Sequence, residues 1–142
     1  MSRALKTPAL ACALLATFAA PAFAENQRLA AAWEAAIGED GGYLTPAAQT
    51  QMTIIAYHAA VAKLCEGFEI DTAKIATASN RVVAEAVKGL EGEALITRHA
   101  DILIDLGTSH GIFLAEGSLH LDTFCAEAAE VRADAAFTDL WR

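Results

Sequence analysis

Positively charged residues are scarce in this sequence. Lys and Arg together number 10, against 18 Asp and Glu, which gives a formal net charge of −8 at pH 7. Binding to nucleic acid or to an anionic lipid surface needs clustered Lys and Arg side chains that contact phosphates. The acidic balance therefore argues against both, and we expect the chain to bind neither nucleic acid nor an anionic membrane surface.

The common motifs of redox and metal chemistry are also missing. There is no C-x-x-C and no C-x-x-C-H, which argues against a thioredoxin-type redox centre and a c-type haem. H-x-x-x-H, H-E-x-x-H and a Glu-x-x-His pair are absent, so the helical zinc and di-iron patterns do not apply. Gly107-Thr108-Ser109-His110-Gly111 has the letters of a G-x-S-x-G elbow, but it lies in a segment with helical periodicity, whereas a nucleophile elbow needs a strand-to-helix turn. We therefore expect no metal and no cofactor.

Histidine and aspartate side chains remain as candidate metal-binding or catalytic groups, but their spacing in the sequence favours a structural role. The four histidines are His58, His99, His110 and His120, and we expect them in or beside the core, partly buried and hydrogen-bonded. Asp101, Asp105 and Asp122 could pair across helices as the carboxylates of a small hydrolase, although acids spaced four apart are more typical of a solvated helix face. We expect a binding protein rather than an enzyme.

The N-terminus has the features of a secretory signal peptide. Arg3 and Lys6 precede an apolar stretch at 9–20, and the small residues of Ala22-Phe23-Ala24 come directly before Glu25. This pattern predicts cleavage after Ala24, with residues 1–24 as the signal and 25–142 as one helical domain. The short apolar region is typical of a bacterial protein exported to the periplasm or the medium.

Two alternatives to a cleaved signal are a membrane anchor and a lipoprotein. The uncharged stretch from Thr7 to Ala24 is at the short edge of a membrane span and contains Pro8 and Pro21. Too few apolar residues precede Cys12 for it to be an acylated lipoprotein cysteine. We therefore expect no stable membrane insertion once the signal is removed.

Removal of the signal changes the charge and the number of cysteines. It takes away two of the ten basic residues and none of the acidic ones, so the remaining chain has a net charge of −10. Only Cys65 and Cys125 remain, in an oxidising compartment where thiols pair. We predict a disulfide between them, which closes a loop of about 60 residues and stabilises the fold by roughly 4 kcal/mol in the loop-entropy model.

Apolar residues recur at helical spacing through the mature chain, and turn or cap residues separate the periodic segments. Thr45-Pro46 and Asp71 are good helix starts, whereas Gly38 and Gly89 are good stops. The expected helices span 27–37, 46–66, 72–88, 91–116 and 119–137. The sequence thus predicts an all-α, single-domain, up-and-down bundle of four or five helices, with one disulfide between the second and last helices.

Three features of these helices are specific expectations. The second helix has two adjacent apolar rows, which predicts burial on two sides. In 91–116, a break at Gly107 would give two helices, whereas an unbroken helix would place Gly107 and Gly111 where another helix can approach closely. Gly117-Ser118 predicts a helix stop followed by a new N-cap, and Trp141 is expected to dock. The expected inward stripe of 91–116 is Leu95, His99, Ile102, Leu106, His110 and Phe113, and that of 119–137 is Leu121, Cys125, Ala128 and Ala135.

One short pattern resembles a known family. Cys65-Glu66-Gly67-Phe68, followed by Asp71 and a helix, with a second cysteine late in the chain, is similar to the HdeA-type periplasmic acid-stress chaperones. The resemblance implies a small secreted helical protein with a single disulfide that binds unfolding clients when the periplasm acidifies. This chain differs from that pattern by a longer segment between the cysteines and by an additional helix before Thr45.

These observations lead to one expected function and two alternatives. We expect an exported helical binding or interaction protein, with a protein partner and with a homodimer compatible with the fold. The alternatives are an HdeA-like acid-stress chaperone and an immunity or inhibitor protein of a periplasmic enzyme. An inhibitor would present an acidic or aromatic plug, for which the loop carrying Glu39, Asp40 and Tyr43 is the candidate binding element.

Overall fold

A computed structural model describes residues 43–133 and 140–142 of the chain. It contains four helices, α2 (Pro46–Leu64), α3 (Thr72–Ala86), α4 (Gly92–Leu119) and α5 (Leu121–Ala133). The only β-type pairing among these residues is an isolated bridge between Ile70 and Trp141. The all-α prediction is confirmed for this part of the chain. The expected signal peptide 1–24, the expected helix 27–37, Glu39 and Asp40 lie outside the described residues.

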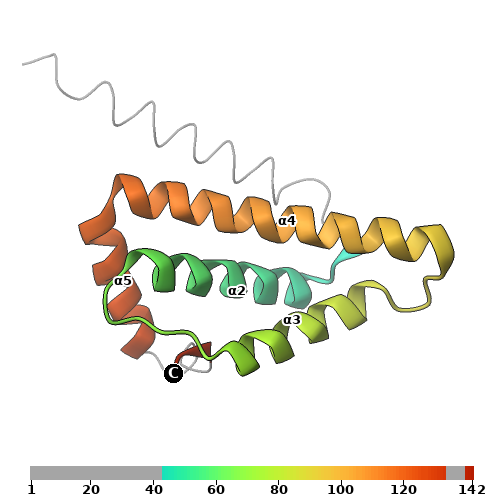
Figure 1. Cartoon of the computed structure of the whole chain (residues 1–142), viewed down its shortest axis with the longest axis horizontal. Helices are drawn as coiled ribbons and strands as arrows, with labels where there is room; N and C mark the ends of the chain where they lie inside the picture. Colours follow the sequence, from blue (N-terminus) through green and yellow to red (C-terminus); the bar gives the residue numbers. More distant parts are fainter. Residues whose placement is uncertain (1–42, 134–139) are drawn as a thin grey trace, which may run out of the picture.

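The helix α2 lies at the centre of the arrangement. Figure 1 shows α4 along one side of α2 and α3 along the other, while α5 runs across the end that α2 and α4 share. Of the α2 residues, Ala48, Met52, Ile55, Ala56, His58, Ala60 and Val61 are buried. The predicted burial of this helix on two sides is therefore confirmed, and it follows from the two adjacent apolar rows on its surface.

The predicted helix starts are present as capping contacts. Thr45 accepts a hydrogen bond at its side-chain oxygen from the backbone N–H of Ala48, at 3.2 Å, and Pro46 takes the first helical position. Asp71 accepts from the N–H groups of Ala73 and Lys74, at 3.0 and 3.2 Å. Each cap satisfies donors that the first turn of a helix otherwise leaves unpaired.

The helix α4 is one unbroken helix of 28 residues. It runs through Gly107 and Gly111, and it also runs through Gly117 and Ser118, so the predicted stop at Gly117 is wrong. The reason is packing: a Cβ atom on Gly117 would lie 2.5 Å from Leu64 Cδ1 and 2.8 Å from Phe124 Cδ1. Tertiary contact with α2 and α5 thus requires a glycine inside the helix and overrides its low helix propensity.

Two of the predicted inward residues point outward. His99 is exposed, because the buried residues of α4 centre on Ile102, Ser109 and Ile112. Leu121 is 45% exposed, whereas Phe124 and Ala128 are the buried residues of α5. In α3, by contrast, the apolar residues at helical spacing do face the core: Val82 and Ala86 are buried, and Ile75 packs against a core cluster.

The two ends of the long loop between the cysteines are joined. A disulfide links Cys65, just after α2, to Cys125 in α5, with the Cα atoms 5.5 Å apart. The cysteines belong to a cluster of buried and partly buried side chains that also contains Val61, Phe124 and Trp141. The predicted pairing is confirmed, and it fixes α5 against the end of α2.

The residues after the undescribed segment 134–139 return to the core. Trp141 is 5% exposed, and its ring lies 4.3 Å from the His58 ring, centroid to centroid. The backbone N–H of Asp71 donates to the carbonyl of Leu140 at 2.9 Å, and the N–H of Arg142 donates to Glu69 at 3.0 Å. The predicted docking of Trp141 is confirmed.

Candidate functional site

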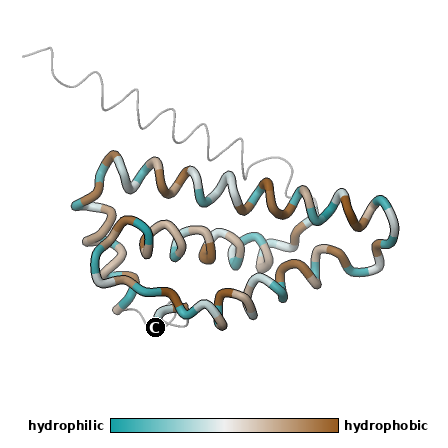
Figure 2. The backbone as a smooth tube through the Cα atoms, in the orientation of Figure 1, coloured by the Kyte–Doolittle hydropathy of each residue, from teal (hydrophilic) through white to brown (hydrophobic). Residues whose placement is uncertain are grey.

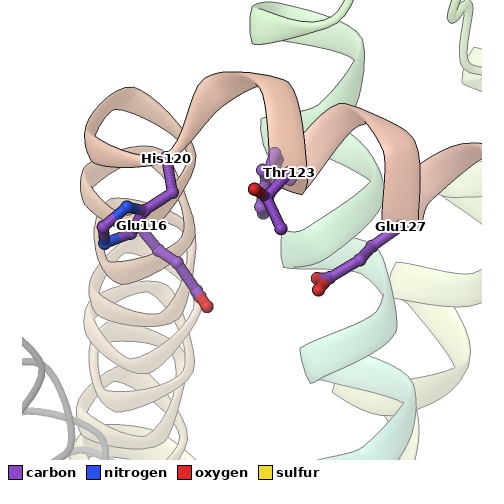
Figure 3. Close-up of a pocket in the computed structure, with 5 residues that line it drawn as sticks. Glu116, His120, Thr123 and Glu127 are labelled. Carbon is purple, nitrogen blue, oxygen red and sulfur yellow. The ribbon is translucent and has the colours of Figure 1, made fainter.

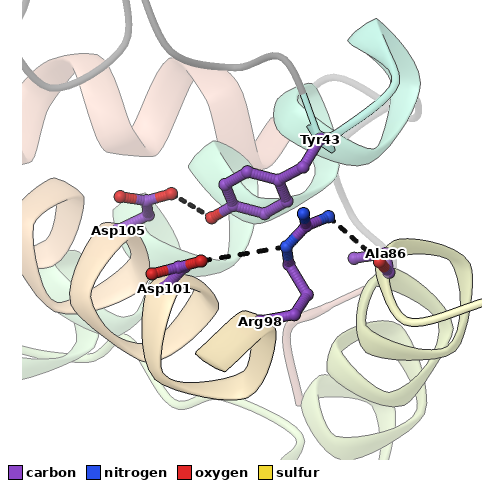
Figure 4. A network of polar contacts seen from close by, with 5 residues as sticks. All are labelled: Tyr43, Ala86, Arg98, Asp101 and Asp105. Carbon is purple, nitrogen blue, oxygen red and sulfur yellow. Dashed lines mark hydrogen bonds and ion pairs between the residues drawn. The ribbon is translucent and has the colours of Figure 1, made fainter. Parts of the chain in front are cut away.

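Tyr43, a candidate binding residue, is anchored against α4 (Figure 4). Its hydroxyl donates a hydrogen bond to the Asp105 carboxylate. The Arg98 guanidinium lies 4.2 Å from the centre of the Tyr43 ring, and it donates to the Ala86 carbonyl at 3.3 Å. Arg98 also approaches Asp101, with 3.8 Å between Nε and Oδ2. One network thus ties the start of the described chain to α3 and α4.

The network keeps the Tyr43 hydroxyl protonated. Partial burial raises the pKa of Tyr43, and the hydrogen bond to Asp105 raises it further. Asp101 and Asp105, considered above as carboxylates of a hydrolase, here contact Arg98 and Tyr43. The binding role of Tyr43 stays a prediction, because the preceding acidic residues of its loop lie outside the described part of the chain.

A pocket of about 280 Å³ lies at the corner between α4 and α5. Its lining residues are Glu116, His120, Thr123, Phe124 and Glu127. Figure 3 shows the Glu116 and Glu127 carboxylates pointing toward one another across the pocket, one from each helix. The sequence does not predict this pair, because the two acids lie on either side of a helix boundary and share no spacing that predicts contact.

The electrostatics of this pocket favour a proton or a cation. Burial raises the pKa of Glu116, the neighbouring Glu127 raises it further, and His120 opposes the shift. Neither carboxylate has a hydrogen bond or an ion pair to another described residue. Two facing carboxylates attract a positively charged group. However, residues 43–133 and 140–142 contain no set of three or more His, Cys, Asp or Glu arranged to hold a metal ion.

The four histidines do not gather at one place. His58 is buried, with its Nδ1 atom 2.8 Å from the carbonyl of Ile54. His110 is partly buried, and its Nε2 atom is buried without a hydrogen-bond partner among the described residues. His99 and His120 are exposed. The expectation of partly buried, hydrogen-bonded histidines is therefore right for His58 and wrong for the two exposed ones.

The outer side of α4 carries no charged residue over most of its length. From Ile96 to Leu119, the charged residues of this helix are Arg98, Asp101, Asp105 and Glu116, and all four are partly buried. The exposed residues over this range are Ile96, Thr97, His99, Ala100, Leu103, Ile104, Gly107, Thr108, Gly111, Ala115, Ser118 and Leu119.

Within this exposed set, one row runs along the helix axis. Ile96, Ala100, Leu103, Ile104, Gly107 and Gly111 follow one another at intervals that place them on a single side. We call this row the outer face of α4. Ile96, Leu103 and Ile104 are 70%, 69% and 64% exposed, and hydrophobic residues recur along the whole helix (Figure 2).

Large apolar side chains on one exposed face are unusual. Contiguous apolar surface on a protein marks a site of contact with another molecule more often than scattered apolar residues do. From Ile96 to Leu119, the charged residues of α4 are partly buried while several large apolar residues are exposed, which is unusual for a surface helix. Among the helices α2 to α5, none is long and apolar enough to cross a membrane.

Comparison with known proteins gives no match to a family model, to a curated protein or to a solved structure.

Proposed function

We propose that this chain is an exported helical binding protein, and that the outer face of α4 is its docking surface for another protein. The observation that carries the proposal is the exposed side of α4 from Ile96 to Leu119, which has no charged residue and on which Ile96, Leu103 and Ile104 are exposed. An uncharged apolar helix face fits the apolar face of another polypeptide, because neither side then buries an unpaired charge.

Export is the second part of the proposal. It rests on the predicted signal sequence before Glu25, and the Cys65–Cys125 disulfide supports it because such bonds persist in oxidising compartments. The mass of the chain recovered from the periplasm of an expression host tests it. Cleavage after Ala24 is the expected result, and an intact N-terminus recovered from the cytoplasm would contradict it.

Site-specific photo-crosslinking tests the docking surface. A photoreactive amino acid at Leu103 should capture a partner protein in cells of the source organism, and mass spectrometry would identify it. The matched control places the same amino acid at Ala84, an exposed residue of α3. Capture of the same proteins from both positions would contradict the proposal.

The affinity of the identified partner gives the second measurement. Leu103→Glu should weaken binding at least about tenfold, because it places a carboxylate in an apolar contact. Ala84→Glu adds the same charge elsewhere on the surface and should leave the affinity unchanged. Equal affinities of the wild type and Leu103→Glu would exclude the outer face of α4 as the binding surface.

A further inference from the structure

Side-chain size changes along the outer face of α4. Its three large side chains, Ile96, Leu103 and Ile104, all precede Gly107. From Gly107 to Ser118, the exposed residues are all small: Gly107, Thr108, Gly111, Ala115 and Ser118. Leu114 in this range is partly buried, and Leu119, the last residue of the helix, is 49% exposed. The exposed side of α4 therefore has two halves. We call residues 96–104, with the large side chains, the raised half, and residues 107–118, with the small ones, the flat half.

The flat half has no explanation inside the described bundle. A Cβ atom at Gly107 or Gly111 would meet nothing within 4 Å, whereas a Cβ atom at Gly117 would meet Leu64 and Phe124. Glycine inside a helix lowers its stability relative to alanine. Internal packing thus accounts for Gly117, while Gly107 and Gly111 leave room for a second helix to approach the backbone of α4.

We infer that the partner of the outer face of α4 is a second copy of this chain, with the two α4 helices packed antiparallel around a two-fold axis at Gly107. This inference rests on the proposed function, because it uses the same surface and names what binds there. In this arrangement, Leu103 lies against Gly111 of the partner subunit, and the reverse contact is made at the same time. The raised half of each helix packs on the flat half of the other, which is the self-complementarity that an isologous dimer requires.

Charge favours this face over the others described. The chain has a net charge of −8, so two copies repel one another. The exposed sides of the other two outer helices carry charged residues: Lys74, Arg81 and Glu85 on α3, and Asp122, Glu127, Glu130 and Arg132 on α5. The outer face of α4 has none, so two acidic chains meet there with the least repulsion and without burying a charge.

Sedimentation velocity of the exported chain at increasing concentration tests for the dimer. The wild type should shift from monomer to dimer, and Leu103→Glu should weaken the dimer at least about tenfold because it brings two carboxylates into the interface. The control Ala84→Glu should dimerise like the wild type. A wild-type chain that stays monomeric over the whole range would overturn the inference.

Cysteine crosslinking tests the register and the direction of the helices. In the proposed dimer Gly107 lies on the two-fold axis, so Gly107→Cys should form a covalent dimer under oxidising conditions. Ala100→Cys is the matched control on the same face. Its two copies would lie about 21 Å apart along the antiparallel helices, since each residue contributes about 1.5 Å of rise. Crosslinking of both variants would indicate parallel helices and overturn the proposed arrangement.

The failures of this inference and of the proposed function can be separated. If the wild type is monomeric but Leu103→Glu abolishes photo-crosslinking and partner affinity, the proposed function stands and the second copy is excluded. If the monomeric Leu103→Glu variant instead loses thermal stability and the wild type captures no partner, the chain's own residues before Tyr43 cover the face, and both proposals fail.

Discussion

The hydroxyl of Tyr43 donates a hydrogen bond to the carboxylate of Asp105, 62 residues further along the chain. The Arg98 guanidinium lies over the ring of the same residue. Both the hydroxyl and the ring face of Tyr43 therefore contact residues of α4. These two contacts hold Tyr43 against α4. Tyr43 therefore has a structural role in addition to any role in binding.

Tyr43→Phe should lower the free energy of unfolding by about 1–2 kcal/mol, because it leaves the partly buried Asp105 carboxylate without its donor. Tyr57→Phe is the matched control. The Tyr57 ring contacts Phe113 and Phe124 at 5.3 and 5.6 Å, centroid to centroid, and its hydroxyl makes no hydrogen bond to the other described residues. Urea unfolding should show a loss for Tyr43→Phe alone, and equal losses would argue against the role of Asp105.

Glycine substitutions in α4 should have opposite effects at two positions. In the monomer, Gly111→Ala should raise the free energy of unfolding by about 0.5–1 kcal/mol, since alanine is the better helix former and the site is open within one chain. Gly117→Ala should lower it by about 1 kcal/mol or more, because the clash with Leu64 and Phe124 outweighs the same gain. Urea midpoints of the two variants give the comparison, and a shift of the same sign in both would contradict the packing described at Gly117.

The effect of Glu116 on stability should depend on pH. Its pKa in the folded protein is raised by burial and by Glu127, so the protonated form favours the fold. That contribution is fully present below the unfolded-state pKa near 4.3–4.5 and is lost as the pH rises through the folded-state value.

A neutral side chain at position 116 should therefore stabilise the protein at pH 7. Glu116→Gln should raise the melting temperature there, with the difference shrinking as the pH falls through the folded-state pKa and vanishing below about 4. The gain should stay below about 1 kcal/mol, because Glu116 is only partly buried and solvent screens the repulsion. Thermal melts of both proteins from pH 3 to pH 8 measure the difference, and a constant difference across this range would contradict a raised pKa of Glu116.

Reduction of the disulfide should lower the free energy of unfolding by up to about 4 kcal/mol, the loop-entropy value for about 60 residues. Urea unfolding with and without reductant, followed by the fluorescence of the buried Trp141, gives the difference. A double Cys65→Ser/Cys125→Ser variant should match the reduced protein and be insensitive to reductant. Equal midpoints for oxidised and reduced wild type would mean that the bond constrains the unfolded chain very little.

Local signals predicted much of the fold. The caps at Thr45 and Asp71 depend on residues within one turn of helix, and the disulfide was predicted because the expected cleavage leaves only two cysteines. The continuity of α4 could not be predicted in this way. Gly117 and Ser118 predict the end of a helix. The packing of Gly117 against Leu64 and Phe124, which come from other helices, explains why the helix continues.

The outer face of α4 could not be predicted from the sequence, for a different reason. Apolar residues of α4 lie on two opposite sides, and the stripe that contains Ile102 was the more regular one. A sequence pattern does not say which of two apolar stripes faces the core. Nor does it show that Arg98 and Asp105 point inward, because their partners, Ala86 and Tyr43, lie far away in sequence.

The contacts that complete this bundle join segments far apart along the chain. The disulfide spans 60 residues, and the Lys74 ammonium reaches the Trp141 carbonyl across 67 residues at 3.5 Å. Since such contacts form only after both segments are available, the buried side of α2 cannot be completed while the later residues are still being synthesised. If the chain is exported unfolded, as proposed above, this order would delay folding until after translocation, and the core would then close in the compartment where Cys65 and Cys125 are oxidised.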